Sequence, residues 1–170
     1  MKLAMVAVCA GLWIAPWATA QKLELKFDAV AARASSKSEM DLDGKLLRLA
    51  ARMAGEADVS GLIAGVQSFH VRKYSFSADG AYSEKDLEPL RSQVAGQSRW
   101  SRILNMKEED ATTEIYVAAQ GDKVSGCLIV SAEARELSVI YMEGTMALAQ
   151  MKKLVDEDAR HELGALFGNQ

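Results

Sequence analysis

The chain has 170 residues, of which 49% are hydrophobic and 25% are charged, and its formal net charge is −3 at pH 7. This composition is typical of a globular protein and excludes a disordered tail or a fibre. The mildly acidic balance gives no overall electrostatic attraction to nucleic acid or to anionic lipid. A chain of this length can bury a core without the help of disulfides or metal.

The first 20 residues are predicted to be a cleavable signal peptide. Lys2 precedes an apolar run over Leu3–Ile14, and the small residues Ala18 and Ala20 follow. A charged start, a short apolar segment and a small-x-small site are the pattern of an export signal. We expect cleavage between Ala20 and Gln21, so that the protein is exported to the periplasm or to the extracellular space.

Two alternatives for this segment fit less well. An uncleaved anchor needs about 20 apolar residues to span a bilayer, and this run is shorter. A lipoprotein signal needs a small residue directly before the lipidated cysteine, but Val8 precedes Cys9. Cleavage removes Cys9, so Cys127 cannot form an intramolecular disulfide and is expected to be buried. Residues 21–170 are predicted to be one globular domain without a transmembrane segment.

The N-terminal half is predicted to mix short helices and strands. A strand or helix entry is expected over residues 21–26, a helix over 27–34, a short strand over 39–42 and a helix over 45–54. In the last of these, the residues at helical spacing are predicted to form the stripe that faces the core: Leu46, Leu49, Ala50 and Met53. Asp43 is placed to cap this helix and Gly55 to end it.

A helical turn is predicted over residues 59–65, a strand over 66–77 and a helix that begins near Ser83 or Asp86. Pro89 favours the later start, because proline is tolerated in the first turn of a helix.

The C-terminal half is predicted to be an antiparallel meander. Four strands, over residues 100–106, 112–119, 124–131 and 136–143, are joined by short polar links. An amphipathic helix is expected over 145–155. The fold class is therefore α+β: a single domain with a mainly antiparallel sheet of about five strands and about three helices.

Two of these strands are apolar on both faces. Leu137, Val139 and Tyr141 alternate with Ile140 and Met142, and Cys127 and Ile129 likewise alternate with Leu128 and Val130. A sheet covered on one side shows apolar and polar residues in alternation instead. Helices are therefore expected on one face, and a second layer or a partner chain on the other.

Two sequence blocks resemble a known family. One is Asp41–Ala50, and the other runs from Thr113–Val117 through Val124–Ser131 to Leu137–Gly144. Together they make the chain similar to an uncharacterised bacterial family, domain of unknown function 4252, over about residues 27–155. The resemblance implies a small exported protein of the bacterial envelope, and it implies no catalytic or binding residues.

Glu39, Asp41, Asp43 and Gly44 match the start of a calcium-binding loop. Such a loop also needs a closing glutamate at its twelfth position, where this chain has Ala50. A turn followed by a helix cap is the better interpretation.

Cys127 with His70 is the one candidate pair of a nucleophile and a base. A nucleophilic cysteine needs a stabilised thiolate, whereas Cys127 lies in an apolar strand, which favours a buried structural role. His70 and His161 lie too far apart in sequence to indicate a zinc site and are expected at the surface or at a sheet edge. No catalytic, cofactor-binding or metal-binding residue is therefore assigned, and no cofactor is expected.

A small basic and aromatic patch comprises Arg99, Trp100 and Arg102. It could stack a base or a sugar, but the acidic chain argues against nucleic acid, and Trp100 is expected in a core or an interface. The acidic runs 108–110 and 156–158 do not differ from ordinary solvated charges.

These observations predict a non-enzymatic envelope module that binds a protein partner or a second copy of itself through the sheet. A carrier of a lipid or another apolar ligand is the first alternative, and an enzyme of unrecognised type is the second.

Overall fold

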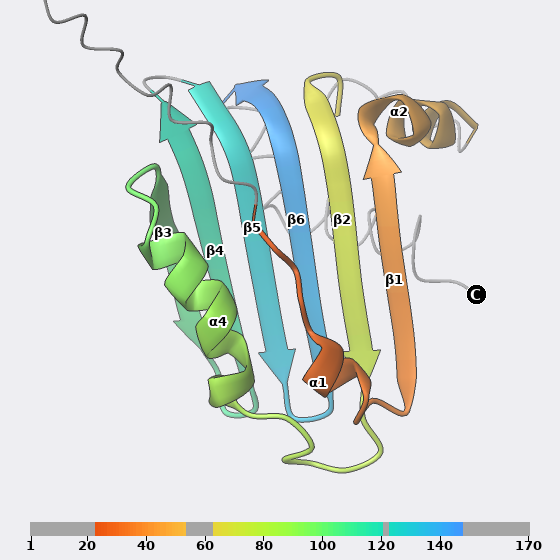
Figure 1. Cartoon of the computed structure of the whole chain (residues 1–170), viewed down its shortest axis with the longest axis vertical. Coiled ribbons are helices and arrows are strands. Elements are labelled where there is room, and N and C mark those ends of the chain that lie inside the picture. The colour runs from red at the N-terminus through yellow and green to blue at the C-terminus, as the bar shows by residue number, and fades with distance from the viewer. Residues whose placement is uncertain (1–22, 54–62, 121–122, 148–170) are drawn as a thin grey trace, which may run out of the picture.

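Six antiparallel strands form one sheet in the order β1-β2-β6-β5-β4-β3 in the computed structural model, which describes residues 23–53, 63–120 and 123–147 (Figure 1). The strands are β1 (Ser36–Asp43), β2 (Val66–Ser75), β3 (Trp100–Lys107), β4 (Ala111–Gln120), β5 (Lys123–Glu133) and β6 (Glu136–Ala147). The helices of the described part are α1 (Asp28–Ala31), α2 (Gly44–Met53) and α4 (Glu84–Ala95). The predicted α+β class and the C-terminal meander are confirmed.

β6 is longer than the sequence pattern indicated. It runs to Ala147 and pairs with β5 as far as Lys123, so the helix predicted over 145–155 does not begin at Thr145. The rest of that predicted helix lies outside the described residues. At the other edge, β1 is a full strand of eight residues, which extends the predicted strand over 39–42 in both directions.

The first face of the sheet is covered by α1, α4 and the segment that leads into α1 (Figure 1). Leu87, Leu90 and Val94 of α4 are buried, and their helical spacing places them on one side of the helix. They share one apolar cluster with residues from five strands, among them Tyr74, Trp100, Tyr116, Leu128, Leu137, Val139 and Tyr141. This cluster buries Leu128 and Val130 of β5 and Leu137, Val139 and Tyr141 of β6 on this side.

The second face carries a separate buried cluster. Leu47 and Ala51 of α2, together with Ile63, pack with sheet residues that include Val66, Phe69, Ile115, Val117, Val124, Cys127 and Met142. The prediction that β5 and β6 are apolar on both faces is therefore confirmed. The chain itself buries much of the second face.

α2 is oriented differently from the prediction. Its buried residues are Gly44, Leu47 and Ala51, whereas the predicted core residues Leu46 and Leu49 are 52% and 53% exposed. Met53 is 82% exposed. Two apolar stripes run along this short helix. The sheet covers the stripe with Leu47 and Ala51, whereas the sequence pattern predicted burial of the stripe with Leu46 and Leu49.

The start of α4 also differs from the prediction. Ser83 and Asp86 form a capping box. In it, the side chain of each residue accepts from the backbone N–H group of the other. The cap fixes the first helical residue at Glu84 and leaves Pro89 inside the helix, so the later start favoured by Pro89 is wrong.

Gly144 combines a positive φ with a close backbone contact. It has a φ of +146°, and a Cβ atom there would lie 2.2 Å from the carbonyl oxygen of Gly65. We expect Gly144→Ala to lower the free energy of unfolding by about 3 kcal/mol or more, because strain and a backbone clash add. Chemical denaturation measures this loss.

Gly80→Ala is the matched control. Gly80 has a φ of +72° but nothing within 4 Å of its added Cβ, so it isolates the cost of the backbone conformation, about 1 kcal/mol. Equal losses in the two variants would contradict the proposed clash.

Candidate functional site

The acidic residues of the calcium-like pattern each have a separate partner. The hydroxyl of Tyr74 donates to Glu39 over 3.0 Å, and the backbone N–H groups of Lys45 and Leu46 donate to Asp43 over 2.8 and 2.9 Å. The bonds from Leu46 and Lys45 hold the pKa of Asp43 below its usual range. Asp43 is thus the helix cap that the sequence predicted.

Asp41 belongs to a polar cluster that sequence analysis missed. It lies directly opposite His70 in the β1–β2 register, and its Oδ1 is 2.5 Å from His70 Nδ1. Arg72 donates to both carboxylate oxygens of Asp41 over 2.9 Å. Partial burial acts to raise the pKa of Asp41, but the bonds from His70 and Arg72 outweigh it and hold that pKa below its usual range.

A cavity of about 260 Å³ adjoins this cluster, lined by Leu23, Leu25, Asp41, His70, Arg72 and Tyr141. The ring of His70 stacks on Tyr141 with centroids 5.7 Å apart, and its side chain is only 15% exposed. The expectation of a surface histidine is therefore wrong. With Nδ1 donating to Asp41, the neutral ring presents Nε2 as an acceptor, and this buried atom has no hydrogen-bond partner within the described part of the chain.

Cys127 and His70 do not form a catalytic pair. Cys127 packs in the cluster on the second face, whereas His70 points to the first face beside Tyr141. Burial raises the pKa of Cys127 to about 12, so the thiolate is disfavoured. The predicted buried, structural cysteine is confirmed; His161 lies outside the described residues.

Trp100 and Arg102 of the basic and aromatic patch make contacts within the protein. Trp100 is 8% exposed and stacks obliquely near Tyr141, as expected for a core residue. Arg102 reaches Glu114 over 3.3 Å, and Arg91 of α4 reaches the same carboxylate over 3.0 Å. Glu114 is 4% exposed, so these two cations compensate a buried charge that the sequence did not reveal.

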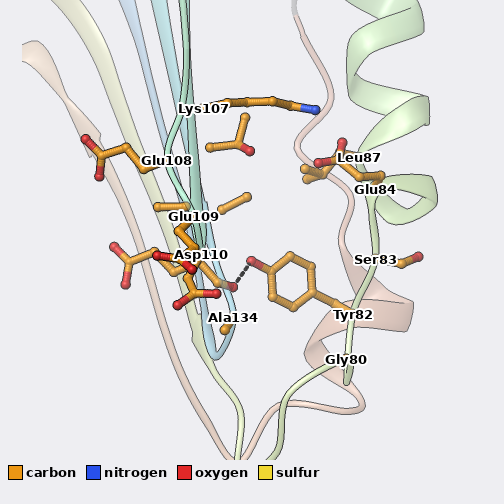
Figure 2. A pocket seen from close by; sticks show the side chains of 14 residues that line it. Gly80, Tyr82, Ser83, Glu84, Leu87, Lys107, Glu108, Glu109, Asp110 and Ala134 are labelled. Carbon is orange, nitrogen blue, oxygen red and sulfur yellow. Dashed lines mark hydrogen bonds between the residues drawn. The ribbon is translucent and has the colours of Figure 1, made fainter.

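An acidic cleft of about 500 Å³ lies at the end of the sheet where β3 meets β4 and β5 meets β6 (Figure 2). Its carboxylates are those of Glu84, Glu108, Glu109, Asp110 and Glu133, and Lys107 is the one basic residue among its lining residues. The hydroxyl of Tyr82 crosses the cleft to the backbone carbonyls of Glu133 and Glu136, and burial raises its pKa to about 12. The predicted acidic run 108–110 thus lines a cleft, while 156–158 lies outside the described residues.

Large apolar side chains are exposed in two places among the described residues. Leu46, Leu49 and Met53 lie on α2, and Ile103 and Met106 lie on the edge strand β3. On α2 the spacing i, i+3, i+7 places them on one side of the helix. The two sets are the apolar surfaces open to a partner in this part of the chain.

The family comparison matches residues 33–154, more than half of the chain, to a domain of unknown function. The chain belongs to the DUF4252 family. No curated protein and no solved structure matched. The family therefore confirms the resemblance noted in the sequence and assigns no activity.

The DUF4252 region contains most of the candidate surfaces. α2, the acidic cleft and the polar residues that line the His70 cavity (Asp41, His70, Arg72 and Tyr141) lie within residues 33–154, whereas Leu23 and Leu25 precede this range. Within the described residues, no group of three His, Cys, Asp or Glu side chains could hold a metal ion. No helix in the described ranges has the length and apolar character that a membrane span requires.

The Cys127 thiol is expected to be inert in the folded protein. Because burial raises its pKa to about 12, a thiol reagent at neutral pH should label Cys127 only when the chain unfolds. Labelling with and without denaturant, followed by mass spectrometry, measures this difference. Rapid labelling of the native protein would show that the second face opens to solvent.

Proposed function

We propose that this protein is an exported bacterial envelope protein that acts as a non-enzymatic binding module. The export step rests on Lys2, the apolar run Leu3–Ile14 and the cleavage site between Ala20 and Gln21, all of which lie outside the described residues. The family match supports the resemblance from which an envelope location was inferred.

The observation that carries the binding function is the exposed apolar stripe of α2. Leu46, Leu49 and Met53 are 52%, 53% and 82% exposed. Full burial of one such side chain by a partner would contribute about 1.5–3 kcal/mol of binding free energy. The stripe lies on a helix that is already fixed, because its other side is buried and Asp43 caps its start. A preorganised surface loses little entropy on binding.

The binding function predicts contact at α2 in the producing cell. A photo-crosslinking amino acid that replaces Leu49 should give an adduct, because this side chain faces the proposed partner. The same amino acid at Lys85, an exposed position of α4, is the control. Mass spectrometry of the purified chain identifies the adduct and also reports whether the chain begins at Gln21.

An adduct yield at position 49 no higher than at position 85 would contradict binding through α2. A chain that retains residues 1–20 and stays in the cytoplasm would contradict the export proposal.

A second candidate function is general-base catalysis in the His70 cavity, the enzyme alternative. Asp41 orients the ring of His70, whose Nε2 has no hydrogen-bond partner among the described residues, and His70 lines a cavity of about 260 Å³. The carrier alternative has less support, since both this cavity and the acidic cleft are lined by charged groups.

This second candidate predicts that the protein hydrolyses an activated ester such as p-nitrophenyl acetate through His70. His70→Gln should remove the activity above background, and His161→Gln, which changes the only other histidine, should retain it. Equal rates for the two variants would exclude His70 as the base.

A further inference from the structure

α2 is divided into three stripes along its length. Each stripe has the spacing i, i+3, i+7, and each is offset from the previous one by one residue, or about 100° around the helix. The first is buried (Gly44, Leu47 and Ala51), the second is basic (Lys45, Arg48 and Arg52) and the third is the exposed apolar stripe (Leu46, Leu49 and Met53). The helix contains no acidic residue.

The exposed side of α2 is therefore both apolar and positively charged. Lys45 and Arg52 are exposed, and Arg48 is half-buried with one N–H group donating to the carbonyl of Val66 over 3.3 Å. The acidic groups nearest to the start of the helix have partners: Asp43 caps α2, and Asp41 binds His70 and Arg72. Within the described residues, the charge that α2 itself carries is thus opposite to the net charge of the chain.

Among the described residues, five acidic side chains line the cleft at the other end of the sheet. The strand register places the acidic cleft level with the start of β1, whereas α2 follows its end (Figure 1). The seven steps from Ser36 to Asp43 span about 23 Å, at about 3.3 Å per residue. This exceeds the Debye length of about 8 Å at physiological ionic strength, so the cleft hardly weakens the positive field at α2.

We infer that the occupant of this surface is an anionic membrane, an inference that rests on the proposed binding function. In an interfacial helix, apolar side chains enter the boundary between headgroups and acyl chains while adjacent lysines and arginines meet the phosphates. α2 follows the end of β1, which is an edge strand of the sheet (Figure 1). Three apolar and two exposed basic side chains give peripheral, reversible binding.

The test measures co-sedimentation of the chain that begins at Gln21 with lipid vesicles. The first 20 residues are omitted because their apolar run would itself bind lipid, and both buried clusters begin after this segment. Vesicles of phosphatidylglycerol and phosphatidylcholine in equal amounts are compared with vesicles of phosphatidylcholine alone. We expect binding to the anionic vesicles only, and weaker binding as salt is raised.

Two variants separate the apolar and the basic contributions. The triple variant Leu46→Gln, Leu49→Gln, Met53→Gln should weaken binding by about tenfold or more, since the inserted apolar area is lost. Lys45→Glu with Arg52→Glu should also weaken it by more than about tenfold, at about fivefold for each basic charge near an anionic surface. Both should keep the unfolding transition of the wild type, because these side chains lie outside the core.

Matched controls carry the same changes elsewhere. Ile103→Gln with Met106→Gln removes exposed apolar side chains from β3, and Lys37→Glu with Lys85→Glu reverses two exposed charges away from α2. Both controls should bind as the wild type does.

Light scattering of the same samples distinguishes the two proposals. One outcome is that the chain does not bind anionic vesicles but dimerises through α2, so that the triple variant is monomeric. This outcome overturns the membrane inference and is consistent with the proposed binding function. A chain that neither binds vesicles nor associates, and gives no crosslink from position 49, overturns both. Vesicle binding that none of the α2 changes weakens also overturns the inference.

Discussion

The structure depends on burying a sheet whose central strands are apolar on both faces. β5 and β6 present Leu128, Val139 and Tyr141 to one side and Cys127 and Met142 to the other, and all five residues are almost fully buried. Such strands cannot face water on either side, so the rest of the chain must supply two separate layers. α1 and α4 serve the first face, and α2 contributes to the second.

The position of α2 follows from this requirement and has a functional consequence. The end of the sheet accepts only one stripe of the helix, through Leu47 and Ala51, and leaves an equally apolar stripe in solvent. Basic side chains flank that open stripe, while the carboxylates of the acidic cleft lie at the far end of the strands. The described part of the chain therefore has a basic and apolar end at α2 and an acidic end at the cleft. The net charge of −3 does not reveal this separation.

Much of the fold could be predicted because it depends on local patterns. Alternating apolar residues with short polar links predict the meander, and the double-sided pattern of β5 and β6 predicts two covered faces. The orientation of α2 could not be predicted, because the stripe that contains Leu46 and the stripe that contains Leu47 have equal spacing and only the sheet selects between them. The start of α4 was mispredicted since the cap at Ser83 and Asp86 outweighs the preference of Pro89. The Asp41–His70 contact depends on the pairing of β1 with β2, which are far apart in sequence, and no local signal encodes it.

The most direct test of the central claim is a fluorescence measurement at the tip of the α2 stripe. In the chain that begins at Gln21, which lacks Cys9, Met53→Cys places a reactive thiol at the most exposed position of the stripe, and Cys127 does not compete for the label because it is buried. With an environment-sensitive fluorophore at position 53, addition of vesicles containing phosphatidylglycerol should shift the emission to the blue, as expected when the label leaves water. The same label introduced by Lys85→Cys should not respond. An unchanged spectrum at position 53, or an equal shift at position 85, would contradict the account of α2 as the membrane-binding surface.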